Sequence, residues 1–160
     1  ILLPKVGGDY RPSSIRSTSR RKNWDKQSLF EDASEKLEPE AFLMFENLFT
    51  FCEENSHDGV GYGTGIENGS FTYYLVRNSN RGSIFSVYSN GILQINFHYM
   101  PNVLDAEEIK EFRVLLNQRT SFEDVMNEDT QFYSREIGAD ISDPHEIEAF
   151  KECVLSLNNL

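Results

Sequence analysis

The segment from Gly61 to Met100 constrains the fold more than any other part of the chain. It contains three apolar and aromatic runs, separated by breaks that are rich in glycine or contain Asn-Gly. Runs of this kind, bounded by turn residues, are typical of neighbouring antiparallel strands. We therefore expect a three-stranded antiparallel meander, with strands at residues 71–76, 84–89 and 92–99.

The Asn90-Gly91 pair sets the expected register of the second hairpin. Asn-Gly favours a two-residue type I′ turn, because both central residues of that turn need positive φ. With this turn, Tyr88 faces Leu93 across the hairpin. One face of the sheet is then apolar and lies under helices, with Ile84, Tyr88, Leu93, Ile95, Phe97 and Tyr99. The other face is mixed and partly open, with Phe85, Val87, Ile92, Gln94, Asn96 and His98.

Helical patterns flank the meander on both sides. Before it, we expect a short helix at 28–37 and a second helix from Pro39, whose apolar stripe holds Phe42, Phe45, Leu48, Phe49 and Cys52. After it, Asp105 caps a helix that runs to about Arg119, and Asp143 precedes the last helix. Between these two, a short helical piece near 122–126 and an extended piece near 132–137 both fit. The predicted class is α+β: an N-terminal helical pair, the three-stranded meander, and C-terminal helices packed on one face.

Charge is divided unevenly along the chain. Residues 1–26 hold seven basic and two acidic residues, a net +5, so the rest carry −16 of the total of −11. A folded part this acidic repels nucleic acid and anionic lipid unless a local basic patch overrides it. We interpret residues 1–23 as a basic flexible linker and residues 24–160 as a single α+β domain. An alternative function for the linker is nucleic-acid binding through a basic arm, made of Arg16, Arg20, Arg21 and Lys22.

The cysteines and the hydropathy pattern indicate a cytoplasmic protein. Cys52 and Cys153 lack the spacing of a metal or redox motif, so we expect free buried thiols. There is no run of 18 apolar residues, so no membrane segment or membrane partner is expected. Since the chain begins at Ile1 rather than Met, we expect either a piece of a longer protein or a processed product.

Four closely spaced glycines, at positions 61, 63, 65 and 69, form a Gly-rich loop before the first expected strand. A dinucleotide-binding fingerprint needs such glycines between a strand and a helix, whereas here a strand follows them. A P-loop needs Gly-Lys-Ser/Thr, which the loop lacks. We expect the glycines to allow bends in the chain, and to let other groups pack closely against the backbone at the margin of the sheet. A binding loop is the alternative.

Residues for catalysis are sparse. The histidines lack the spacing of a zinc site, and no serine lies in a G-x-S-x-G setting. We therefore predict no catalytic residue, no metal site and no cofactor. An enzyme stays open as an alternative: a small hydrolase or metal-assisted nuclease using His57, Asp58 and His98, provided that these side chains converge.

Several of these segments together resemble an uncharacterised bacterial domain. The shared features are Asn23-Trp24-Asp25, the Phe-rich helix, the loop ending in Gly69-Ser70-Phe71, and the hairpin of residues 84–97. One departure lies in the loop: that domain often has an aromatic residue directly before the second glycine pair, and this chain has Tyr62 there. The resembling domain is found at the C-terminus of larger proteins, some with restriction-endonuclease-like or other DNA-linked domains upstream. The resemblance implies the same setting here, with the upstream domain as a partner, and it carries over no catalytic residue.

The leading hypothesis is a non-catalytic accessory or interaction module of a larger bacterial DNA-associated protein. It would bind a partner protein or a ligand through the Gly-rich loop and the mixed face. The candidate binding residues are Tyr62, Thr64, Asn68, Tyr74, Asn96 and His98. The alternatives are the small hydrolase or nuclease and DNA binding through the basic arm. The sequence does not identify the ligand, the oligomeric state or the upstream domain.

Overall fold

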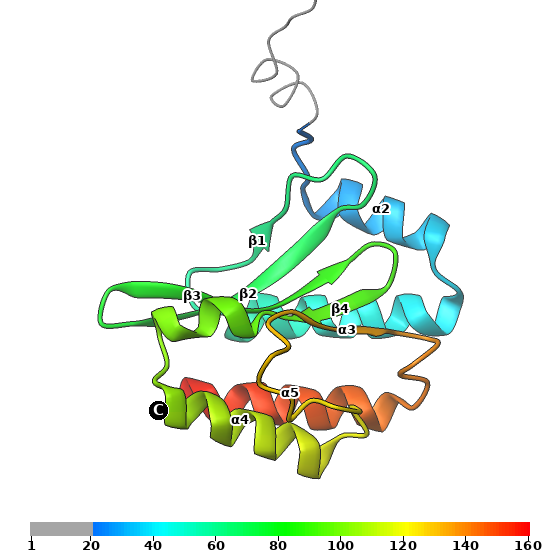
Figure 1. Ribbon diagram of the computed structural model, residues 1–160. Coiled ribbons are helices and arrows are strands. Elements are labelled where there is room, and N and C mark those ends of the chain that lie inside the picture. The colour runs from blue at the N-terminus through cyan, green and yellow to red at the C-terminus, as the bar shows by residue number, and fades with distance from the viewer. Residues whose placement is uncertain (1–20) are drawn as a thin grey trace, which may run out of the picture.

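Five antiparallel strands form one sheet in chain order (Figure 1). The computed structural model describes residues 21–160. The α+β class is confirmed, but the expected sheet of three strands is wrong, because a strand is added at each edge. The strands are β1 (Gly61–Tyr62), β2 (Ser70–Arg77), β3 (Asn80–Tyr88), β4 (Ile92–Ile95) and β5 (Tyr133–Glu136).

Four α-helices accompany the sheet in the described part of the chain. They are α2 (Lys26–Lys36) and α3 (Pro39–Asn55) before it, α4 (Ala106–Arg119) after β4, and α5 (Pro144–Asn158) at the end. Asp105 and Asp143 cap α4 and α5 as expected, each accepting a backbone N–H in the first turn. In residues 21–160, none of the helices has the length and apolar character needed to cross a membrane.

The second hairpin differs from its expected register by one residue. Val87 pairs with Leu93, and Phe85 pairs with Ile95. The reason is the turn: Gly91 has a φ of +96° and its N–H donates to the Tyr88 carbonyl at 2.9 Å, so three residues rather than two connect the strands. A shift of one residue moves the side chains of β3 to the other face relative to those of β4. Phe85 and Val87 therefore join Leu93 and Ile95 on the covered face, and the expected division into two faces is wrong for β3.

Two local expectations are also corrected. The third expected strand ends at Ile95, because residues Phe97–Asn102 form a 3₁₀ helix, η1, in which Phe97 and Met100 are buried. The three-residue spacing of these two side chains suits a 3₁₀ helix rather than a strand. The helical piece expected near 122–126 is a run of turns, whereas the extended piece near 132–137 is confirmed as β5.

The core lies between the sheet and the helices α3 and α5. Figure 1 shows α4 and α5 below the sheet, with α3 running beneath the strands. Phe45 of α3 contacts Phe71 edge to face, with ring centroids 5.3 Å apart, and Phe150 of α5 contacts Phe85 at 5.0 Å. The sheet face that the helices cover, here called the core face, carries Phe71, Tyr73, Leu75, Phe85, Val87, Leu93, Ile95 and Tyr133, all buried.

Candidate functional site

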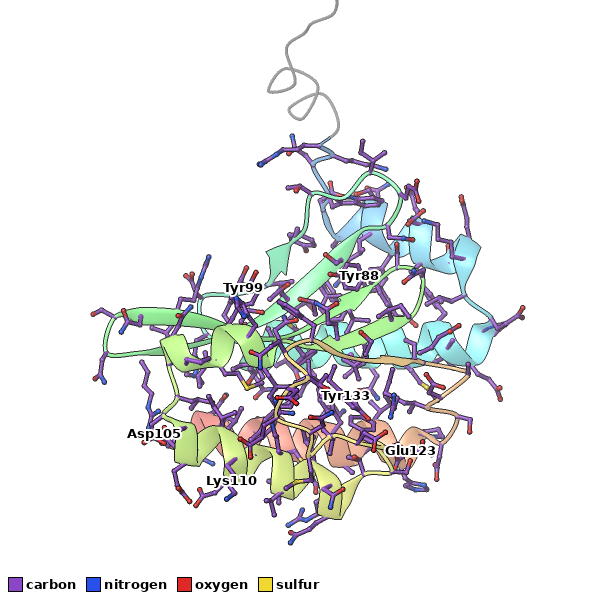
Figure 2. The ribbon with its side chains drawn as sticks, in the orientation of Figure 1. Tyr88, Tyr99, Asp105, Lys110, Glu123 and Tyr133 are labelled. Atoms are coloured by element: carbon purple, nitrogen blue, oxygen red, sulfur yellow. The ribbon has the colours of Figure 1, made fainter. Side chains whose placement is uncertain are left out.

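The face of the sheet opposite the core face is lined by hydroxyl and amide side chains. Pairing places these side chains on one surface, because residues opposite each other in neighbouring strands point the same way. Figure 2 shows the core residue Tyr133 between the strands and the helices α4 and α5, and Tyr88 among the strands. We call this surface the polar face; it carries Ser70, Thr72, Tyr74, Ser83, Ser86, Tyr88, Ile92, Gln94, Asn96 and Ser134.

A hydrogen-bond network crosses the polar face from β2 to β4. The hydroxyls of Thr72 and Ser86 lie 2.7 Å apart. Asn96 Nδ2 donates to Ser83 Oγ at 2.6 Å and to Ser86 Oγ at 3.2 Å, while Gln94 Nε2 donates to Asn96 Oδ1 at 2.9 Å. Only 3% of Asn96 is exposed, so its amide is the fixed centre of the network. Side chains held in this way lose little conformational freedom when a partner binds.

Tyr74 lies at the β1 side of the same face. The Arg81 guanidinium carbon is 4.1 Å from the centroid of the Tyr74 ring, and Arg81 also pairs with Asp58 at 2.9 Å. The ring rests on the backbone of Gly61, where any side chain would collide with it. Glycine at this position is therefore explained by close packing, as the sequence predicts.

Three exposed aromatic rings stand beside β4 and β5. His98 and Tyr99 of η1 contact Phe132, with ring centroids 5.4 and 5.7 Å from the phenyl ring. Tyr99 is 45% exposed and Phe132 is 43% exposed. Phe132 directly precedes β5, in which Tyr133 lies on the core face and Ser134 lies on the polar face. We call these three residues the aromatic cluster; contiguous exposed rings of this kind mark interaction surfaces more often than ordinary surface does.

The Gly-rich loop holds the start of the folded chain against the sheet. Trp24 Nε1 donates to the Gly65 carbonyl at 2.7 Å, and the Lys22 N–H donates to the Thr64 carbonyl at 3.1 Å. The Lys22 ammonium lies 3.8 Å from the centroid of the Trp24 ring. A Cβ at Gly69 would lie 2.8 Å from that ring. The loop thus packs around Trp24, and the absence of side chains at its glycines allows the close contact with the indole ring.

Two further predicted residues lie away from the polar face. The side-chain oxygen of Asn68 accepts from Lys36 of α2 at 3.0 Å. Tyr62 pairs with Phe71 and so belongs to the core-face side, where its ring is 6.4 Å from that of Phe49. Partial burial raises the pKa of the Tyr62 phenol.

The structure therefore divides the six predicted binding residues into two groups. Tyr74 and Asn96 lie on the polar face, and His98 belongs to the aromatic cluster beside it. The other three, Tyr62, Thr64 and Asn68, surround the Gly-rich loop. The sequence pattern does not indicate Phe132, and it predicts Tyr88 and Tyr99 on the apolar face. The only sequence signal for Phe132 is its place at the start of an extended piece.

The residues of the enzyme alternative have separate contacts. His57 completes the outer edge of β2, since its N–H donates to the Tyr74 carbonyl at 2.9 Å and its Nδ1 accepts from the Val76 N–H at 3.0 Å. His98 lies against Phe132, with β3 and β4 between it and β2 in the order of the sheet. Across residues 21–160, no three His, Cys, Asp or Glu side chains gather as ligands for a metal.

The basic arm lies partly outside the described residues, which leave out Arg16 and Arg20. Arg21 is exposed, and Lys22 is the residue that stacks on Trp24. DNA binding through this arm stays a prediction.

No protein-family model, curated protein or solved structure matches the chain. The fold and the candidate site define an α+β protein with one sheet face covered by helices and a second face lined by polar side chains. The resemblance to a bacterial accessory domain remains a prediction.

Proposed function

We propose that this domain is a non-catalytic interaction module that binds a partner protein through the polar face and the aromatic cluster. The observation that carries the proposal is the continuity of the two: a fixed hydroxyl–amide network lies beside three exposed rings in mutual contact. Aromatic residues anchor protein interfaces because they bury a large area with few rotatable bonds, and a polar surround supplies directional hydrogen bonds.

The shape of this surface and the net charge of the chain favour a protein partner over nucleic acid. A sheet face is broad, so it suits a macromolecular surface more than a small molecule, which needs a concave site. The chain carries a net charge of −11, which opposes association with phosphates. Tyr74, Tyr88 and Gln94 are half-buried, so their free polar atoms are the groups available to a partner.

A site-specific photocrosslinking experiment tests this proposal in the full-length parent protein expressed in its own host. A photoreactive amino acid replaces Tyr99 in one variant and Leu43 in the matched control, where Leu43 is a 64% exposed residue of α3. We expect a discrete protein adduct from position 99 and none from position 43. In addition, Phe132→Ala should reduce the adduct at least tenfold, while it changes the free energy of unfolding by less than about 1 kcal/mol. Equal adducts from both positions, or none from position 99, would contradict the proposal.

The wider setting belongs to the same proposal. We infer that the module is delivered by an upstream, DNA-associated domain of a larger bacterial protein. The motifs of residues 23–97 and the basic composition of residues 1–23 support this inference. The coding sequence upstream of Ile1 decides it: an open reading frame that continues into a nuclease-like domain is the expected result, and a start codon at or near Ile1 is the contrary one.

A further inference from the structure

Arg113 of α4 is a buried cation on the opposite side of the core from the polar face. Only 3% of the residue is exposed. Its Nη1 donates to the Val125 carbonyl and its Nη2 donates to the Thr130 carbonyl, each at 2.9 Å. The guanidinium carbon lies 3.6 Å from the centroid of the Phe97 ring. All of these contacts are with neutral groups.

The charge of Arg113 has no direct counter-ion in the described part of the chain. Within residues 21–160, no carboxylate forms an ion pair with it; Glu128 acts on it only from a longer distance. Burial lowers the pKa of the Arg113 guanidinium, and Glu128 opposes this shift. A guanidinium has five N–H donors, and two hydrogen bonds to carbonyls leave further donors free. A buried charge without a partner is costly, so a site that keeps one is suited to receive an anion.

Arg113 is one of the residues that line a cavity of about 170 Å³ between η1, α4 and the segment before β5. Phe97 and Ile109 form its apolar wall, and Lys110, Glu128 and Gln131 line it together with Arg113. Figure 2 shows Lys110 on α4. The volume is close to that of an apolar protein cavity that holds one benzene molecule, roughly 150 Å³. One wall is thus apolar and another is cationic.

We propose that this cavity, the Arg113 pocket, binds a small organic acid. The carboxylate lies against the free N–H groups of Arg113, whose planar fork matches a carboxylate in a bidentate geometry. The body of the acid packs on Phe97 and Ile109. Lys110 adds a second positive charge, while the negative charge of Glu128 disfavours ligands with two negative charges. The pocket is separate from the polar face, so binding of an acid here is independent of the function proposed for the polar face.

The competing explanation is that Arg113 only ties the segment around Val125 and Thr130 to α4. The test must therefore show binding, because loss of stability alone fits both explanations. Benzoate is the probe, since it combines a carboxylate with a body that fits the cavity. Benzamide, acetate and inorganic phosphate are compared with it at equal ionic strength. The readouts are calorimetric titration and the NMR signal of the Arg113 Nε–H group in the unmodified protein.

We expect saturable benzoate binding that shifts the Arg113 signal, weaker acetate binding, and no response to benzamide or phosphate. Lys110→Gln, an exposed change that leaves the fold intact, should weaken benzoate binding about fivefold, as expected for one partly exposed ion pair. Lys26→Gln, an exposed lysine of α2, is the matched control and should leave affinity unchanged. The proposal is overturned if benzamide binds as well as benzoate, if phosphate binds more tightly, or if the Arg113 signal does not move.

Discussion

Among single residues, Trp24 decides whether the Gly-rich loop and the start of α2 stay attached to the sheet. It is 7% exposed and donates to the Gly65 carbonyl. Trp24→Phe keeps most of the apolar contact but removes the donor, so we expect a loss of about 1–2 kcal/mol in the free energy of unfolding. Trp24→Ala also removes the ring and should cost about 3–5 kcal/mol. Urea unfolding at pH 7 measures both.

The control for this prediction is an aromatic residue that is not buried. Phe132→Ala removes a ring that is 43% exposed and should change the free energy of unfolding by less than about 1 kcal/mol. If Trp24→Phe is as stable as the unmodified protein, the indole hydrogen bond does not hold the loop.

The packing role of the glycines was predictable from their spacing next to a strand, but Trp24 as the residue that packs on them was not. Trp24 lies 41 residues from Gly65, and no local pattern connects them.

Among the secondary-structure elements, one ion pair ties β2 to the start of α4. Arg77 donates to both carboxylate oxygens of Glu108, at 2.8 and 2.7 Å, and Glu108 also accepts from the Asp105 N–H at 2.9 Å. These contacts, with Arg77 the larger cause, lower the pKa of Glu108 to about 2. A carboxyl whose pKa is lowered by folding stabilises the protein above its unfolded pKa of 4.5, and this contribution is lost as the pH falls towards 2.

The test compares Glu108→Gln with Glu107→Gln, an exposed neighbour on α4. Both partners of the ion pair are partly exposed, so water screens their attraction. We expect Glu108→Gln to cost about 1 kcal/mol at pH 7, and Glu107→Gln to cost almost nothing. The cost of Glu108→Gln should shrink between pH 4.5 and 2, as followed by urea unfolding across this range. A cost that is independent of pH would show that the ion pair does not contribute.

The elements also show where sequence reasoning succeeded and where it failed. The start of α4 at Asp105 and that of α5 at Asp143 were predictable, because a cap and the first turn lie within a few residues of each other. The register of the second hairpin was not. Asn90-Gly91 fits a two-residue turn and also a three-residue turn with a left-handed glycine, and each places apolar side chains on the covered face. Packing against α3 and α5 distinguishes them, and the local sequence does not contain that information.

At the level of the whole molecule, the residues of the candidate site were predictable where they lie in one local pattern and not where distant segments meet. Tyr74 and Asn96 were predictable because each alternates with apolar residues within one strand pattern. Phe132 was not, since it reaches the aromatic cluster only through the pairing of β4 with β5, after an intervening helix. The mistaken register also hid Tyr88 and Tyr99. Sites assembled by pairing between distant segments are therefore the part of this protein that the sequence alone does not specify.

The two cysteines test whether residues 24–160 fold as one unit. Cys52 of α3 and Cys153 of α5 are both buried, and burial raises their pKa values to about 12 and about 11. Because the thiolate is the reactive form, neither should react with a thiol reagent while the domain stays folded. The helices pack on the same sheet face and share a hydrogen bond from Asn158 Nδ2 to the Asn55 carbonyl at 3.2 Å.

We therefore expect both thiols to be modified only through global unfolding, at equal rates that rise together with urea. Mass spectrometry of the two cysteine peptides gives these rates directly. Faster modification of Cys153 in dilute urea would mean that α5 opens separately, and that the chain contains two units rather than one.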